Sequence, residues 1–184
     1  SELDEAKRLV DEVVRRLEEL LREDKKLVAE VEREVRELLE RNARLLKEVA
    51  DRIRRLKEEG GDNREELTRR LEKLVRDVEE HSKEVKKRIE RLIREVEKHT
   101  DEVLERVKKL VEDVKRELEK LRNEDEKVVR EIERLLRELE KALEDVEREL
   151  RRSKDRLRKL AEEVKKVLDD SRRELERLRE ELRT

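Results

Sequence analysis

The sequence contains no cysteine, no proline, no methionine and no aromatic residue, and these absences remove whole classes of function. Without cysteine there are no disulfides, no thiolate nucleophile and no thiolate ligands for zinc. Without aromatic rings there is no platform on which the bases of a single-stranded nucleic acid stack. The net charge of −2 provides no basic surface for a phosphate backbone. Nucleic acid is therefore not an expected partner.

Long apolar runs are also missing. No stretch approaches the roughly 18–20 consecutive apolar residues that a membrane-spanning helix needs, so we expect no membrane partner. The first residues, Ser1 to Asp4, do not resemble a signal peptide, and the location of the protein in a cell stays unknown.

What the sequence does contain is charge, at 60% of all residues, with the two signs interleaved. Leu, Ile and Val nevertheless exceed the roughly 20% below which a chain is expected to stay unfolded. They recur in steps of three and four residues, which is the period of an amphipathic α-helix. On the middle segment we place Leu67, Leu74, Leu92 and Leu110 on this apolar stripe. The sequence therefore predicts an all-α fold.

Two interruptions divide this pattern into three segments. Gly60-Gly61-Asp62-Asn63 holds the only two glycines, which predicts a helix stop, and Asp62 with Glu65 resembles a capping box for the next helix. Arg122–Glu126 is a weaker break, because it has no glycine and the apolar phase continues across it. We expect a turn there; a continuous helix would instead make this part of the packing intermolecular. The expected helices are about 2–59, 63–121 and 125–183.

Polar residues interrupt the apolar stripe of each segment at a spacing of 18 residues. Eighteen residues in five stripe steps equal 3.6 residues per turn, the value of a straight helix, whereas a seven-residue repeat would impose a supercoil. The sequence predicts an elongated, nearly untwisted, antiparallel three-helix bundle (up-down-up) that forms one domain, 1–184. The interrupting residues are Asp24 and Asn42, His81-Ser82 and His99-Thr100, and Ser153 and Ser171.

The register of the helices follows from distances along the chain. Asp24 and His99 lie equally far from the first connector, and so do Asn42 and His81. Antiparallel packing should therefore bring Asp24 to His99 and Asn42 to His81. An imidazole can donate a hydrogen bond from one nitrogen and accept one at the other, so each histidine could link two neighbouring helices. We interpret the polar residues as two buried layers that penalise shifted registers. One layer comprises Asp24, His99, Thr100 and Ser153, and the other Asn42, His81, Ser82 and Ser171.

Three more specific functions of the same residues, as a metal site, a catalytic triad or a pH switch, have less support from the sequence. His81 and His99 lie roughly 27 Å apart along a helix, so they cannot share a metal ion, and one His–Asp pair is a poor zinc site. Asp24, His99 and Ser153 match a catalytic triad by composition, but no loop is available to form an oxyanion hole. Protonation of both histidines could instead split the layers and act as a pH switch. We expect no catalytic residue, no metal and no cofactor.

The chain as a whole resembles computationally designed parametric helical bundles with buried hydrogen-bond networks. The resemblance rests on the 18-residue repeat, the surface of Glu, Lys and Arg, the Gly60–Asn63 connector and the polar layers in register. Natural three-helix repeats of the spectrin kind are similar in outline but usually carry aromatic residues and irregular core positions. The resemblance implies a hyperstable scaffold that is not an enzyme and requires no partner.

The alternative function is a homo-oligomeric interaction module, which could respond to pH through its histidines. Adjacent apolar pairs on the first segment support it, because they widen the apolar face of that helix. These pairs are Val13-Val14, Leu20-Leu21 and Leu38-Leu39.

Overall fold

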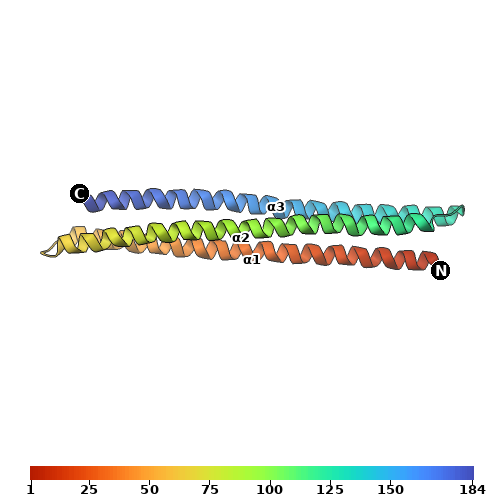
Figure 1. The fold of residues 1–184 in the computed structure, drawn as a ribbon, viewed down its shortest axis with the longest axis horizontal. Coiled ribbons are helices and arrows are strands. Elements are labelled where there is room, and N and C mark those ends of the chain that lie inside the picture. Colours follow the sequence, from red (N-terminus) through yellow and green to blue (C-terminus); the bar gives the residue numbers. More distant parts are fainter. The chain divides into compact units, whose positions relative to one another are not determined.

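A computed structural model describes residues 1–184 and consists of three α-helices of 58 residues each. They are α1 (Glu2–Glu59), α2 (Arg64–Leu121) and α3 (Glu126–Arg183), and no strand is present. Figure 1 shows their order along the chain. The predicted all-α fold of three antiparallel helices is confirmed.

The first connector, residues 60–63, ends α1 with a glycine in the left-handed region. Gly60 has a φ of 40°, and its N–H donates to the carbonyl of Leu56 at 3.2 Å. Glycine suits this position because it lacks the Cβ that makes the conformation costly in other residues. The predicted capping box does not form: Asn63 is the N-cap, its carbonyl accepting from Leu67 N–H at 3.0 Å. Consequently α2 begins at Arg64, one residue later than expected.

The second connector, residues 122–125, is a turn made by side chains without any left-handed residue. Asn123 Oδ1 accepts from the N–H of Asp125 at 2.9 Å, and Asp125 Oδ1 accepts from the N–H of Lys127 at 3.0 Å. Asp125 is thus the N-cap of α3, since its carboxylate satisfies an N–H that the helix itself leaves free. The alternative of a continuous helix through these residues is excluded.

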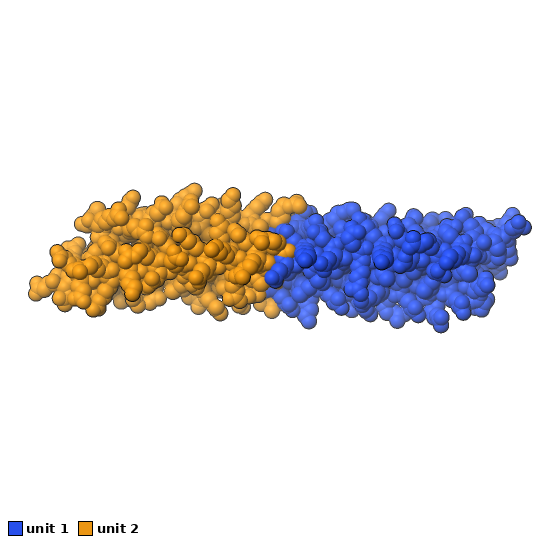
Figure 2. All heavy atoms as spheres, in the orientation of Figure 1, with its two compact units in different colours: residues 1–30, 95–157 blue, residues 31–94, 158–184 orange.

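Each helix contributes to two compact units. Unit 1 comprises residues 1–30 and 95–157, and unit 2 comprises residues 31–94 and 158–184 (Figure 2). Within unit 1, ion pairs show that α1 and α3 run parallel to each other and antiparallel to α2. Lys7 pairs with Glu131 and Lys25 with Glu149, whereas Lys115 pairs with Glu140 and Lys154 with Asp101. The expectation of a single domain stays a prediction.

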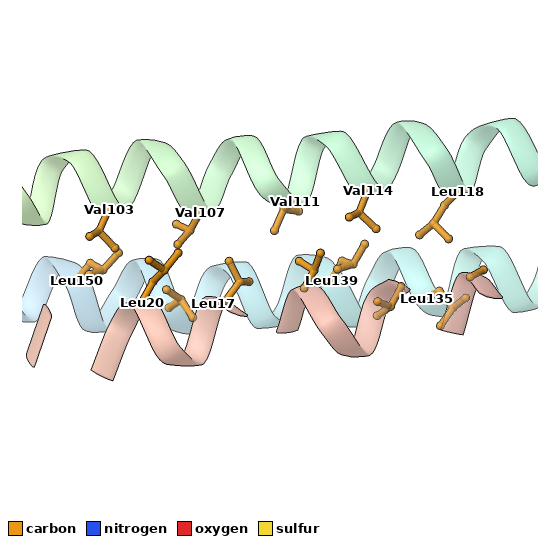
Figure 3. Packing of buried hydrophobic residues seen from close by; sticks show 14 of the residues in the cluster. Leu17, Leu20, Val103, Val107, Val111, Val114, Leu118, Leu135, Leu139 and Leu150 are labelled. Carbon is orange, nitrogen blue, oxygen red and sulfur yellow. The ribbon is translucent and has the colours of Figure 1, made fainter. Parts of the chain in front are cut away.

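The core of unit 1 is aliphatic, and Figure 3 shows valines of α2 pointing toward leucines of α1 and α3. The centre of the α2 stripe differs from the predicted phase by one residue. Val111 is fully buried, whereas its neighbour Leu110 is half-buried. The β-branched member of the pair occupies the centre and the longer leucine covers its edge. The labelled core residues are Leu17, Leu20, Val103, Val107, Val111, Val114, Leu118, Leu135, Leu139 and Leu150.

Unit 2 has a core of the same kind with the same correction. Val75 and Ile93 are buried, and the preceding Leu74 and Leu92 are half-buried. Leu67, which the sequence placed on the stripe, is 43% exposed because it lies in the first turn of α2, next to the connector. The buried cluster near the connector comprises Leu46, Val49, Ile53, Leu71, Val75, Val78, Leu175 and Leu178.

Candidate functional site: two buried polar layers

The polar residues singled out from the sequence form two sets, one in each unit. The Asp24 layer comprises Asp24, His99, Thr100 and Ser153 in unit 1, and the Asn42 layer comprises Asn42, His81, Ser82 and Ser171 in unit 2. Asp24, Asn42, Thr100, Ser153 and Ser171 are the buried polar residues of the protein. In each layer α1 supplies the acid or amide, and α2 and α3 supply hydroxyl groups.

The Asn42 layer is a continuous chain of hydrogen bonds across all three helices. Ser82 Oγ on α2 donates to Asn42 Oδ1 at 2.6 Å, and Asn42 Nδ2 donates to Ser171 Oγ on α3 at 3.3 Å. Ser171 Oγ donates in turn to the carbonyl of Val167, four residues earlier, at 3.0 Å. Each polar atom of the buried Asn42 side chain therefore has a partner from a different helix.

The Asp24 layer is built on the equivalent positions but is incomplete. Thr100 Oγ1 donates to Asp24 Oδ1 at 2.6 Å, and His99 Nδ1 lies 3.4 Å from the same oxygen. Asp24 is fully buried, yet its Oδ2 has no hydrogen-bond partner. Ser153 is buried in the same unit without a hydrogen bond to Asp24 or His99. The layer thus links α1 to α2 but not to α3.

The structure shifts the partner on α2 by one residue from the predicted register. Thr100 and Ser82, not the histidines, occupy the positions on the stripe of α2. One residue corresponds to about 100° around a helix, so His99 and His81 lie at the edge of the layers. The His99 side chain is 36% exposed, and His81 is half-buried and makes no hydrogen bond to Asn42. The 18-residue spacing from Ser82 to Thr100 and on to the apolar Leu118 was the signal for the correct phase.

Ion pairs join neighbouring helices in both units. In unit 1, Lys25 Nζ lies 3.1 Å from Glu149 and Lys154 Nζ lies 2.8 Å from Asp101. The hydrogen bond from Lys25, together with the charges of Lys25, Arg152 and Arg148, holds the pKa of Glu149 below its ordinary value. In unit 2, Arg88 reaches Glu34 on α1 at 3.0 Å and Arg179 reaches Glu79 on α2 at 2.6 Å. Because these pairs are partly exposed, each adds little stability.

The geometry does not support the catalytic or metal-binding readings of these residues. His99 Nδ1 faces Asp24 as in a catalytic triad, but Ser153 makes no hydrogen bond to the imidazole, so the nucleophile–base pair of a triad is absent. Nowhere in residues 1–184 do three or more His, Asp or Glu side chains gather as ligands for a metal ion. A surface depression of about 400 Å³ beside Ser82 is lined mostly by charged side chains. None of the three helices combines the length and apolarity that a membrane crossing requires.

Comparisons with known proteins give little further information. No protein-family model matches the chain, and no curated protein matches its sequence. One solved structure that is similar to it is described as "Computationally designed three helix bundle". The match covers 98% of this chain and 85% of that chain, with 20% sequence identity and a TM-score of 0.39. The three-helix fold of this chain therefore rests on its own helices and contacts.

Proposed function

We propose that the chain is a designed structural scaffold in which buried polar layers specify how the three helices align. The observation that carries this proposal is the hydrogen-bond chain of the Asn42 layer. It joins α2 to α1 and α1 to α3, and it satisfies both ends of a buried amide. A slip of either neighbouring helix would leave that amide facing apolar side chains, which is costly without a replacement hydrogen bond. Aliphatic residues alone discriminate less between registers, because one leucine substitutes for another.

The distribution of apolar surface supports a scaffold that works as a single chain. The second members of the adjacent pairs on α1, which suggested an oligomer, are half-buried against unit cores, as Val14 and Leu21 are in unit 1. Leu67 is the one large hydrophobic residue that is exposed. A stable association between copies requires a sizeable apolar patch, which one leucine does not provide. Light scattering should give a mass close to 22.6 kDa; twice that mass would support the oligomeric alternative.

The direct test removes both layers, because the hydrogen bond from Thr100 to Asp24 would otherwise still align α1 with α2. In the variant Asp24→Leu/Asn42→Leu/Ser82→Ala/Thr100→Val/Ser153→Ala/Ser171→Ala no buried polar atom of either layer remains to be satisfied. Because replacing both partners of a buried hydrogen bond by apolar groups of similar shape can be nearly neutral or stabilising, we expect the variant to fold with unchanged or higher stability. Its helices should, however, populate more than one register.

Register is measured with spin labels on cysteines, since the chain has no cysteine of its own. Glu34 and Arg88 are suitable label positions, because Arg88 is exposed, Glu34 is only half-buried and their side chains meet between α1 and α2. The parent should give one narrow distance distribution and the layer-free variant a broader or divided one. A single narrow distribution in both proteins would show that apolar packing and the connectors set the register, and the proposal would fail.

A further inference from the structure

A groove between α1 and α3 in unit 1 holds a depression of about 390 Å³ with an apolar floor. Leu17 and Val146 are buried in this floor, and Val14, Leu21 and Ala142 are half-buried in it. All the residues that line the depression belong to unit 1, so it lies within one compact unit. Its size falls within the range of known binding clefts.

A small residue at a core position of α3 accounts for the hollow. Eighteen residues further on, the same position of the repeat is Leu160, which is buried, and the next residue is Ala161, which is exposed. At the depression the order is reversed, because Ala142 lines it and the leucine follows as Leu143. One residue is about 100° around a helix, so the larger side chain is turned away from this groove.

The rim of the depression is acidic. Of the six charged residues that line it, five are carboxylates, and Lys141 is the one base. The depression between α2 and α3 in unit 2 is instead lined by three acids and four bases. Asp145 and Glu149 are ion-paired within the chain, whereas Asp11 and Glu18 form no ion pair. Negative charge is therefore available on the α1 side of the groove.

The carboxylates alternate between the two walls of the groove. The two ion pairs that join α1 to α3 are 18 residues apart on both helices, so the helices run in step between them. In this register Glu138 on α3 lies level with Val14 on α1, and about one turn later Glu18 on α1 lies level with Ala142 on α3. Acidic side chains thus flank the apolar floor on both sides.

We propose that this groove binds a basic amphipathic helix of a partner, as a fourth helix of unit 1. The apolar stripe of that helix packs on the floor, with one leucine-sized side chain in the hollow beside Ala142. Lysine or arginine side chains on both flanks of the stripe pair with Asp11, Glu18 and Glu138. A second copy of this chain is less complementary to the rim, because acidic and basic residues are interleaved along its helices.

The probe for this site is a synthetic helical peptide with leucines at spacings of three and four residues and lysines on both flanks. The same peptide with glutamate in place of each lysine is the control. In ¹⁵N NMR titrations of the full chain, the lysine peptide should shift the amide signals around the groove and give a Kd that rises with salt, and the glutamate peptide should not bind. No shifts with the lysine peptide, or shifts mainly away from the groove, overturn the proposal.

Charge-matched variants separate the site from general attraction to an acidic surface. Asp11→Asn/Glu18→Gln should weaken binding of the lysine peptide by up to about 30-fold, the upper range for two exposed ion pairs. Glu12→Gln/Glu19→Gln removes the same charge from the adjacent exposed positions of α1, which do not line the groove, and should weaken binding much less. Equal weakening by the two variants overturns the proposal.

The hollow is tested by Ala142→Leu, which changes no charge and introduces the residue that the repeat has at Leu160. Binding of the lysine peptide should weaken by roughly tenfold, the equivalent of about half of one buried leucine, while circular dichroism shows unchanged helix content. An unchanged Kd shows that the hollow receives no side chain and overturns the proposal. A dimer of the parent that becomes a monomer in Ala142→Leu would place a second copy in the groove and overturn it as well.

Discussion

Removing one hydroxyl from the Asn42 layer should be more harmful than its size suggests. Ser82 Oγ donates the 2.6 Å hydrogen bond to Asn42 Oδ1, and the Asn42 side chain is 1% exposed. Ser82→Ala deletes one oxygen, leaves the packing nearly unchanged and leaves Asn42 Oδ1 without a hydrogen-bond partner. A buried polar atom without its partner costs about 1–3 kcal/mol. At about 2–4 °C per kcal/mol for a chain of this length, Tm should fall by about 2–12 °C.

Guanidinium-induced unfolding followed by circular dichroism measures this effect, because the long helices give a strong signal. The control adds Asn42→Leu to Ser82→Ala, which removes the stranded amide as well. Ser171 keeps its bond to the carbonyl of Val167, so most of the lost stability should return. A cost below about 0.5 kcal/mol for Ser82→Ala, the range of ordinary surface substitutions, would refute the reasoning, as would a double variant that is no more stable than the single one.

Three further outcomes follow from the fold. Leu139→Ala in the core of unit 1 should destabilise the protein by about 2–5 kcal/mol in chemical denaturation, since the side chain is fully buried. Gly60→Ala should cost about 1–2 kcal/mol because of its positive φ, whereas Gly61→Ala, which has no such φ and open space around its Cβ position, should cost less than half of that. Lys25→Gln should raise the pKa of Glu149 in an NMR titration, because it removes the largest cause of the lowered value. The stability from this pair is present above the ordinary glutamate pKa and disappears as the pH falls through the lowered one, so the variant should lose stability at neutral pH but not at low pH.

The helices and their ends were largely predictable, because they depend on local chemistry. The apolar period predicted three helices, and Gly60 marked a stop that only a left-handed glycine makes easily. The N-caps were harder to assign, since Asp62 and Asn63 are both good caps and adjacent. Their choice depends on the path of the connector in space, which the sequence does not specify. At Asn123 and Asp125 both residues turned out to serve, the first in the turn and the second as the cap.

The layers were predictable in their spacing but not in their phase. The register was predicted from the histidines, but the next residue along the chain, Ser82 or Thr100, faces the buried layer in each case. The same displacement by one residue affected Leu110 and Val111, where two adjacent apolar residues fit the period equally well. Which of two neighbours faces the core is decided by packing against the other helices. The lack of a partner for Asp24 Oδ2 could not be predicted, because it depends on how the side chains of three helices are placed in the folded layer.

The short connectors have a consequence for the uniqueness of the fold. Because each helix repeats its pattern every 18 residues, a helix that slid by one full repeat would again set polar against polar and apolar against apolar. In the role that we propose for them, the layers penalise slips of one or two turns but discriminate poorly against a slip of one full repeat. Such a slip displaces a helix by roughly 27 Å, whereas a connector of four residues spans at most about 14 Å. Covalent tethering thus removes a near-degenerate state that the side chains leave open, and a chain nicked in either connector would recover access to it.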